Sequence, residues 1–184
     1  MRPRTATAIE VGATVTRLGP IWVAAGSQGL RVVTVPGGTR EACLRLIERH
    51  SPGATLVDGG PLVEQAIAEL EAYLAGRLRR FSVPLDLIGT EFQRRVWEAV
   101  AAIPYGETAT YQEIAVRIGR PRAARAVGAA NAANPLAIVI PCHRLVGSDG
   151  SLTGYGGGLA MKRILLDLEA RHARAPRWGP SCPD

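Results

Sequence analysis

Apolar residues in the first fifth of the chain follow the pattern expected of β-strands. Between positions 9 and 35 apolar side chains recur in short runs, and two of these runs, IWVAA and LRVVTV, flank Gly26-Ser27-Gln28-Gly29. This arrangement predicts strands joined by a hairpin turn. The spacing then changes to a helical period. It predicts one helix from Thr39 to His50 and another from Pro61, a favoured first-turn residue, to about Leu74.

The pattern breaks at residues 76–89, GRLRRFSVPLDLIG, which contain Gly and Pro and which we interpret as a linker. Thr90-Glu91-Phe92-Gln93 then matches a capping box and opens a helix. We expect its buried stripe to consist of Phe92, Val96, Ala99 and Val100.

Two short helices are predicted next. Thr110-Tyr111-Gln112-Glu113 is a second capping box, and the helix that it opens runs to about Ile118. After the tight turn Gly119-Arg120-Pro121, a further helix extends from Arg122 to about Asn131, which makes a helix-turn-helix candidate. A last helix is expected over roughly Leu159–Ala170.

The predicted fold class is α/β (α+β), with a small N-terminal α/β domain and a mostly helical C-terminal domain that contains the helix-turn-helix. The predicted boundaries are 1–80 for the first domain, 81–170 for the second and 171–184 for a flexible tail. No apolar run approaches the roughly 20 residues that cross a bilayer. The start of the chain, MRPRTATAIEVGATV, lacks the apolar stretch of a secretory signal, so we expect a cytoplasmic protein.

The charge of the chain favours a polyanionic partner without establishing one. The net charge is +6 and the pI is near 9.9, and Lys162 is the single lysine among 22 cationic residues. Each phosphate that a basic protein neutralises releases counterions, which favours binding to nucleic acid. Many basic proteins bind no nucleic acid, however, and a coding bias toward arginine explains the composition equally well.

The helix predicted over residues 122–131 consists almost entirely of small residues. Small side chains allow close approach either to another helix or to the walls of a DNA groove. Arg122 and Arg125 share a face, as they would on a DNA-binding helix or in an ordinary solvated charge pair. The helix offers few side chains for reading bases, so any DNA binding should depend on shape and backbone contacts.

The cysteines do not follow the pattern of a metal site or of a disulfide framework. Cys43, Cys142 and Cys182 are far apart, no CxxC pair exists, and the three histidines are equally scattered. A zinc site needs about four clustered ligands, so we expect neither a structural metal nor a disulfide framework.

Cys142 lies in the most informative segment, IVIPCHR. Its neighbours His143 and Arg144 are two cationic groups that would favour the thiolate, although a small buried hydrophobe is the alternative interpretation. A glycine-rich loop follows, and its backbone could approach a flat ligand closely. Tyr155 in this loop would either stack on such a ligand or belong to the core. Glu169 is either the orienter of a base or a solvated helix charge.

Five segments together resemble the catalytic domain of O6-alkylguanine-DNA alkyltransferases. They are GTEFQRRVWEAVAAIPYGETATYQEIA, RAARAVGAANAANP, IPCHR, GYGGG and LLDLE, in the order and spacing of that family, and they cover nearly half of the chain. The N-terminal half resembles the family's small α/β domain only loosely.

The resemblance implies a self-alkylating DNA repair protein. Cys142 would attack the alkyl carbon, His143 would activate it through a water molecule, and Glu169 would hold the imidazole in the useful tautomer. Asn134 would brace the loop before the active site. Because the thioether has no evident route back to the thiol, each molecule would react once.

The lesion must leave the base stack before a cysteine can reach it. The resemblance implies that Arg125 fills the vacated space and that Tyr111 contacts the phosphate and the flipped base, in a minor-groove mode of binding. The other residues expected to contact DNA or the base are Arg122, Ala126, Arg144, Leu145, Tyr155, Gly156 and Gly157.

The implied partner is double-stranded DNA that contains O6-alkylguanine, bound by a monomer with no membrane and no obligate protein partner. No cofactor is expected. Some members of the family carry zinc in the N-terminal domain, but residues 1–42 contain no cysteine or histidine, so we expect no metal.

Three other functions remain open at this point. A lesion sensor would bind alkylated DNA and keep Cys142 unmodified. A Cys-His hydrolase would turn over repeatedly. A helix-turn-helix regulator would prefer a DNA sequence and would tolerate the replacement of Cys142 by alanine.

Overall fold

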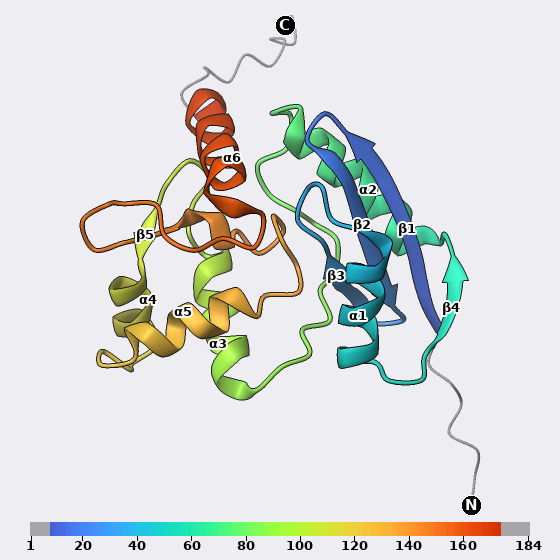
Figure 1. Ribbon diagram of the computed structural model, residues 1–184, viewed down its shortest axis with the longest axis horizontal. Helices are drawn as coiled ribbons and strands as arrows, with labels where there is room; N and C mark the ends of the chain where they lie inside the picture. The colour runs from blue at the N-terminus through green and yellow to red at the C-terminus, as the bar shows by residue number, and fades with distance from the viewer. Residues whose placement is uncertain (1–7, 174–184) are drawn as a thin grey trace, which may run out of the picture.

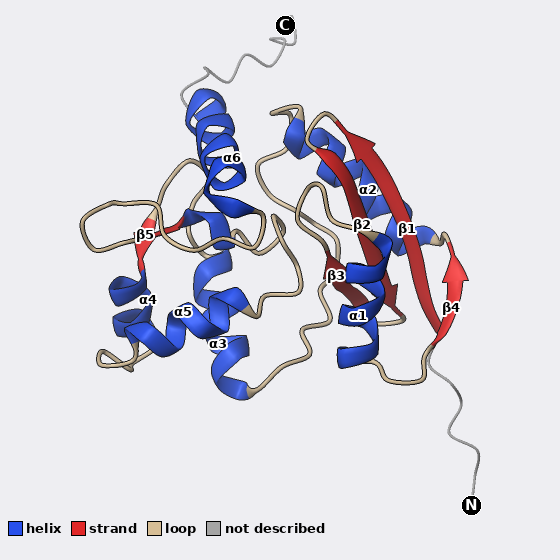
Figure 2. Ribbon diagram, in the orientation of Figure 1, coloured by secondary structure: helices blue, strands red, loops and turns tan. Residues whose placement is uncertain are grey.

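The computed structural model describes residues 8–173, which form two lobes (Figures 1 and 2). The first lobe is built on a four-stranded sheet in the order β3-β2-β1-β4. Strands β1 (Ala8–Thr16), β2 (Gly19–Gly26) and β3 (Gly29–Val33) form an antiparallel meander. The turn between β2 and β3 lies at the predicted position, and Gly29 there has a φ of 147°, which glycine adopts without a steric penalty.

Two helices cover opposite faces of this sheet. α1 (Arg40–His50) packs Cys43 and Ile47 on one face, against Ile9 and Val32. α2 (Pro61–Leu74) lies on the other face, where Gly12 of β1 makes room for it. Both helices have the predicted bounds to within one residue. Tyr73, near the end of α2, is fully buried on the side of the second lobe.

The fourth strand was not predicted. β4 (Thr55–Asp58) pairs in parallel with β1, and all four of its residues are exposed. A strand of four exposed residues has no hydrophobic alternation, so the pattern that marks most strands is missing here.

The second lobe contains α3 (Glu91–Ala101), α4 (Tyr111–Arg117), α5 (Ala124–Ala132) and α6 (Gly158–Ala173). A short parallel pair, β5 (Ala109–Thr110) and β6 (Leu145–Val146), and the 3₁₀ turn η1 (Cys142–Arg144) lie between them. Both predicted capping boxes are present, at Thr90 and Thr110. The buried stripe of α3 includes Trp97, which the prediction omitted, whereas Phe92 is only half-buried.

The segment predicted as a linker is part of the packed structure. The backbone of residues 84–86 pairs with β3, since the Leu30 amide donates to the Pro84 carbonyl and the Asp86 amide donates to the Leu30 carbonyl. Farther along the same edge, the Val33 amide donates to Pro135 and the Ala137 amide donates to Val33. One continuous hydrophobic core includes residues of both lobes. The loop before Cys142 is thereby attached to the sheet of the first lobe.

The last helix extends beyond its predicted end. α6 reaches Ala173, so residues 171–173 of the predicted tail are helical, and the rest of that tail lies outside the described residues. No helix within residues 8–173 is both long and apolar enough to cross a membrane.

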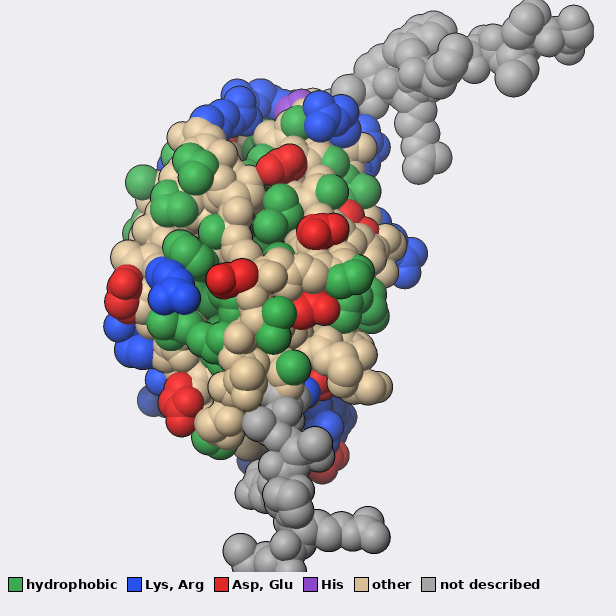
Figure 3. Space-filling view, turned by 90° about the vertical axis from the view of Figure 1, so that its right-hand side faces the viewer, with side chains coloured by type: hydrophobic (Ala, Val, Ile, Leu, Met, Phe, Trp, Pro, Cys, Tyr) green, Lys and Arg blue, Asp and Glu red, His purple; other side chains and the backbone are tan. Residues whose placement is uncertain are grey.

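Figure 3 shows the face of the molecule on the side of β1 and β4. Hydrophobic side chains are exposed across it, with acidic side chains among them and basic side chains mostly toward the rim. Leu56 and Val57 of β4 are 41% and 47% exposed. The pocket described next opens on the second lobe instead.

Candidate active site

Cys142 begins the 3₁₀ turn η1 and lines a pocket at the surface of the second lobe. Its backbone amide donates to the Ile140 carbonyl at 2.7 Å, and its carbonyl accepts from the Asn131 side chain at 3.4 Å. The residue is 7% exposed. The backbone around Cys142 is therefore held from two directions.

Asn134 braces the loop that leads to Cys142. Its amide nitrogen donates to the Ile140 carbonyl at 3.0 Å, and its amide oxygen accepts from the Leu136 amide at 2.9 Å. Ile138, in the middle of this loop, has a φ of 71°. A β-branched residue in this region is strained, by roughly 1–3 kcal/mol, and persists only where the surrounding contacts determine the conformation. Asn134 and the β3 edge supply those contacts.

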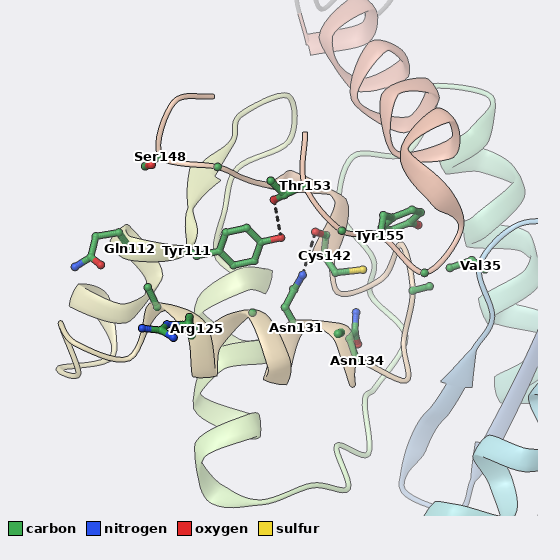
Figure 4. Close-up of a pocket in the computed structure, with 17 residues that line it drawn as sticks. Val35, Tyr111, Gln112, Arg125, Asn131, Asn134, Cys142, Ser148, Thr153 and Tyr155 are labelled. Carbon is green, nitrogen blue, oxygen red and sulfur yellow. Dashed lines mark hydrogen bonds between the residues drawn. The ribbon is translucent and has the colours of Figure 1, made fainter. Parts of the chain in front are cut away.

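The pocket has a volume of about 920 Å³ and mostly apolar walls. In Figure 4, Arg125 and Gln112 lie toward one end of it, and Cys142, Tyr155 and Val35 lie toward the other. Tyr111 stands between the two ends, where its hydroxyl accepts a hydrogen bond from Thr153 at 3.3 Å. One wall consists of the small residues of α5: Ala124, Gly128 and Ala132.

Behind Cys142, away from this lining, lies a buried network centred on the carboxylate of Glu169. Oε1 accepts hydrogen bonds from His143 Nε2 at 2.8 Å, Arg144 Nη2 at 2.9 Å and the Tyr73 hydroxyl at 2.6 Å. Oε2 accepts from Arg144 Nε at 2.9 Å and the Gly106 amide at 3.0 Å. Both oxygens are thus fully engaged, and Glu169 has no exposed surface.

The charges in this network set the protonation states. Burial raises the pKa of Glu169, but the hydrogen bonds and charges of His143 and Arg144 outweigh it and lower the pKa to about 2. Burial lowers the pKa of His143, so its imidazole is neutral at pH 7. Nε2 then carries the proton that it donates to Glu169, which leaves Nδ1 as the basic nitrogen. Nδ1 is buried and has no hydrogen-bond partner within residues 8–173.

The surroundings of the Cys142 thiol differ from those expected from the sequence. Burial raises the pKa of its thiol, and a hydrogen bond with Asn134 and the charge of Lys162 only partly offset this. Arg144 does not supply the expected cationic contact, because its guanidinium is engaged by Glu169 and the Ile103 carbonyl. The two flanking cations expected from the sequence are therefore not available to the thiol, because His143 is neutral and Arg144 is paired with Glu169.

The predicted site residues fall into three groups. Those that line the pocket are Tyr111, Arg125, Asn134, Cys142, Tyr155 and Gly156. Those that form the buried network are His143, Arg144 and Glu169. Those that do neither are Arg122, Ala126, Leu145 and Gly157. Arg122 and Ala126 are exposed beside the pocket, whereas Leu145 is buried and its carbonyl accepts from Lys162.

Several residues of the site were missed by sequence reasoning. Tyr73 and Val35 come from the first lobe, and no local motif marks them. Lys162 is fully buried, with its ammonium donating to the carbonyls of Leu145 and Thr153. The sequence does mark this residue, because it is the only lysine in a chain whose other basic side chains of this kind are all arginine. Within residues 8–173 no three His, Cys, Asp or Glu side chains gather closely enough to hold a metal ion.

Comparison with known proteins agrees with this geometry. Residues 91–171 match the family model of the 6-O-methylguanine DNA methyltransferase DNA-binding domain, and residues 11–87 match that of its ribonuclease-like domain. A methylated-DNA–protein-cysteine methyltransferase of Methanosarcina barkeri is 46% identical over 85% of this chain and 94% of its own. The chain belongs to this family.

Two further comparisons support the same family assignment. The Mycolicibacterium paratuberculosis methylated-DNA–protein-cysteine methyltransferase is 62% identical over 60% of this chain and 67% of its own. The crystal structure of Mycobacterium tuberculosis OGT in complex with DNA shares 42% identity with this chain, covers 90% of it and 94% of its own chain, and superposes with a TM-score of 0.75. The resemblance noted in the sequence is therefore confirmed, as is the fold class.

Proposed function

We propose that this protein repairs DNA by accepting the alkyl group of an O6-alkylguanine on Sγ of Cys142, once per molecule. The observation that carries the proposal is the position of Cys142, with a large apolar pocket on one side and the buried His143–Glu169 pair behind it. The pocket is large enough for a purine, since ligand pockets commonly span about 300–1,000 Å³. The crystal structure of the related M. tuberculosis protein in complex with DNA supports DNA as the partner.

The chemical step balances without a cofactor. The thiol proton passes to Nδ1 of His143, either directly or through a water molecule, and the thiolate sulfur attacks the alkyl carbon. A carbon–sulfur bond forms as the bond from that carbon to O6 breaks, and the guanine leaves with the bonding electrons and takes up a proton. Glu169 remains ionised and stabilises the imidazolium that forms.

The pocket requires an extrahelical base. The sulfur lies inside a concave site, so the damaged nucleotide must rotate out of the duplex, at a cost of roughly a few kcal/mol. Exposed Arg125, at the end of the pocket away from Cys142, would occupy the vacated stack. Tyr111 and the backbone around Tyr155 and Gly156 would hold the base. The small residues of α5 would let its backbone approach the minor groove.

Three of the predicted DNA contacts take other roles in this proposal. Arg144 orients Glu169, because its guanidinium is buried in the network. Leu145 supports the loop through Lys162, and Gly157 leaves room for the side chains of Tyr155 and Met161, which a Cβ at this position would approach to 3.0 and 3.2 Å. Arg122 and Ala126 remain candidates for contact with the DNA backbone, since both are exposed.

Mass spectrometry tests the proposal. The full chain is mixed with a duplex that carries a single O6-methylguanine, and both the intact protein and its peptides are analysed. We expect one methyl group per protein, located on the Cys142 peptide and absent from Cys43. Lesion binding without methyl transfer would make the protein a sensor, and release of product beyond one equivalent would make it a turnover enzyme.

A further inference from the structure

The hydroxyl of Tyr73 makes the shortest hydrogen bond to the Glu169 carboxylate. The distance from Tyr73 Oη to Glu169 Oε1 is 2.6 Å, compared with 2.8 Å from His143 Nε2 to the same oxygen. Tyr73 belongs to α2 of the first lobe, whereas the other donors to Glu169 all come from the second lobe. The first lobe thus makes a direct polar contact with the His143–Glu169 pair, through which the proposed proton transfer takes place.

The hydroxyl can act only as a donor to this carboxylate. Tyr73 is completely buried, and burial together with the charge of Glu169 holds its pKa well above the ordinary value. A neutral tyrosine carries one proton, and Glu169, which stays ionised, can only accept it. Nε2 of His143 lies 3.3 Å from the same hydroxyl. The Tyr73 hydroxyl and the His143 N–H therefore converge on a single oxygen of Glu169.

We propose that Tyr73 is a positioning residue for alkyl transfer, through which the first lobe holds Glu169 so that His143 keeps Nδ1 free as the proton acceptor. The inference rests on the proposed function for its chemical meaning. Tyr73 exchanges no proton in this scheme. By donating to Oε1 it restricts the rotation of the carboxylate and withdraws part of the charge that Glu169 offers to the imidazole.

The surroundings of Tyr73 keep its ring in place. It packs against Phe81, with 5.5 Å between ring centroids, and edge-on against Tyr105 at 6.0 Å. The ring of Tyr105 in turn lies near the guanidinium groups of Arg79 and Arg144, at 5.9 and 5.7 Å. The ring of Tyr73 is consequently held by aromatic contacts with Phe81 and Tyr105, which fix where its hydroxyl points.

Tyr105 provides a matched control. It is a second tyrosine of the same cluster, and its hydroxyl is also buried, but that hydroxyl has no hydrogen-bond partner within residues 8–173. Replacing Tyr105 by phenylalanine removes an oxygen from the cluster and keeps the ring contacts with Arg79 and Arg144. Only the variant at position 73 removes a donor from Glu169.

The expected direction of the pH effect follows from the charges that face the pair. Glu169 and Arg144 surround His143 directly, and Lys162 also acts on it. Without the Tyr73 hydroxyl, Oε1 has one donor fewer, and more of its charge acts on the His143 N–H. The pKa of His143 then rises, so a higher pH is needed to obtain the neutral base. The acid limb of the rate profile should move toward higher pH.

The test compares Tyr73→Phe and Tyr105→Phe in the full chain. Single-turnover methyl transfer from a duplex with O6-methylguanine is followed across the pH range in which histidine titrates. For Tyr73→Phe we expect a rate about tenfold lower, as for the loss of one hydrogen bond to a charged group. We also expect the acid limb to move upward by about half a pH unit. Tyr105→Phe should match the parent protein. An unchanged limb in Tyr73→Phe, or equal shifts in both variants, would overturn the proposal.

Two further measurements test the positioning role of Tyr73 independently of protein stability and of methyl transfer. NMR titration of His143 reports its pKa and tautomer without any transfer reaction, and we expect Tyr73→Phe to raise that pKa. If the parent protein transfers no methyl group, this result still decides the role of Tyr73. If Tyr73→Phe fails to fold, fluorotyrosine at position 73 keeps the ring and makes the hydroxyl a stronger donor. It should lower the pKa of His143, and no change would count against the proposal.

Discussion

On one side of Cys142 lies the Glu169 network, in which both carboxylate oxygens accept hydrogen bonds and the side-chain donors, from Tyr73, His143 and Arg144, are buried. On the other side lies a pocket of about 920 Å³ with mostly apolar walls. The first region is assembled from both lobes, with Tyr73 contributed by α2. The second consists mainly of α5 and the loop around Tyr155, and among residues 8–173 Val35 is its one lining residue from the first lobe.

The two regions are built differently because they have different tasks. A saturated network in a low-dielectric interior holds one arrangement of charges, and the loss of any partner leaves a buried group unsatisfied. A pocket of small side chains leaves room for a base and its alkyl group. Changes in the network should therefore alter rate, pH dependence and stability, whereas changes in the pocket should alter the choice of substrate.

The largest effect is expected from replacing Cys142, which lies between the network and the pocket. Cys142→Ala removes the sulfur and should abolish methyl transfer, while binding to lesion-containing duplex persists because the pocket remains. Mass spectrometry and a gel-shift assay measure the two properties. Cys43→Ala, on the buried face of α1, is the control and should retain full transfer. Methyl transfer that survives in Cys142→Ala would place the acceptor elsewhere.

Glu169→Gln should have the next largest effect. The amide can donate where the carboxylate could only accept, so it favours the wrong His143 tautomer and leaves Arg144 buried without its counter-charge. We expect transfer to slow by about a thousandfold and the free energy of unfolding to fall by about 3 kcal/mol. Single-turnover kinetics and denaturant unfolding measure these effects. Glu98→Gln, on the exposed side of α3, is the control and should change neither.

The same variant should change the response to acid. The pKa of Glu169 is about 2 in the folded protein and 4.5 for an unperturbed glutamate. The stability that its ionised form contributes is thus complete above pH 4.5 and is lost as the pH falls toward 2. The free energies of unfolding of the parent and of Glu169→Gln, each measured as a function of pH, should converge over that interval. A difference in free energy between the two proteins that stays constant over this pH range would show that the pKa of Glu169 is not lowered by folding.

Arg125→Ala tests the pocket side. If Arg125 fills the vacated stack, its loss should slow transfer from duplex DNA by about a hundredfold, because the cost of extruding the base is no longer offset. Transfer from the free base O6-benzylguanine should be unaffected, since no base has to be extruded. Arg122→Ala removes the same charge from a candidate contact with the DNA backbone outside the pocket lining, and it should slow transfer from duplex DNA much less than Arg125→Ala does. Equal effects on duplex and free base would contradict the role of Arg125.

Gly156→Ala should have the smallest effect. A Cβ at this position would meet Val35 Cγ1 at 3.7 Å, an ordinary contact, so the fold should tolerate it. Because Gly156 lines the pocket, the added methyl group should slow transfer from O6-benzylguanine by about tenfold and leave O6-methylguanine nearly unchanged. Competition between the two substrates measures the ratio. A uniform loss for both would indicate a change in the loop rather than in the space available.

Local sequence determined the helices, most of their starts and the segment IPCHR that marks the family. The capping boxes at Thr90 and Thr110 are local contacts between residues three apart, so they can be recognised without a fold. The same holds for the hairpin at Gly29 and for the linked motifs around Cys142. The exposed strand β4 was missed because its residues carry no hydrophobic alternation.

Only the tertiary structure decided which way the polar groups around Cys142 point. Arg144 follows Cys142 by two positions, yet its guanidinium turns inward to Glu169, and Tyr73 reaches the same carboxylate from 96 positions away. Lys162 is buried because two backbone carbonyls satisfy its ammonium. Partners such as these are set by how the lobes pack. The pKa values of His143 and Glu169 depend on burial and on those partners, so neither could be obtained from the order of residues along the chain.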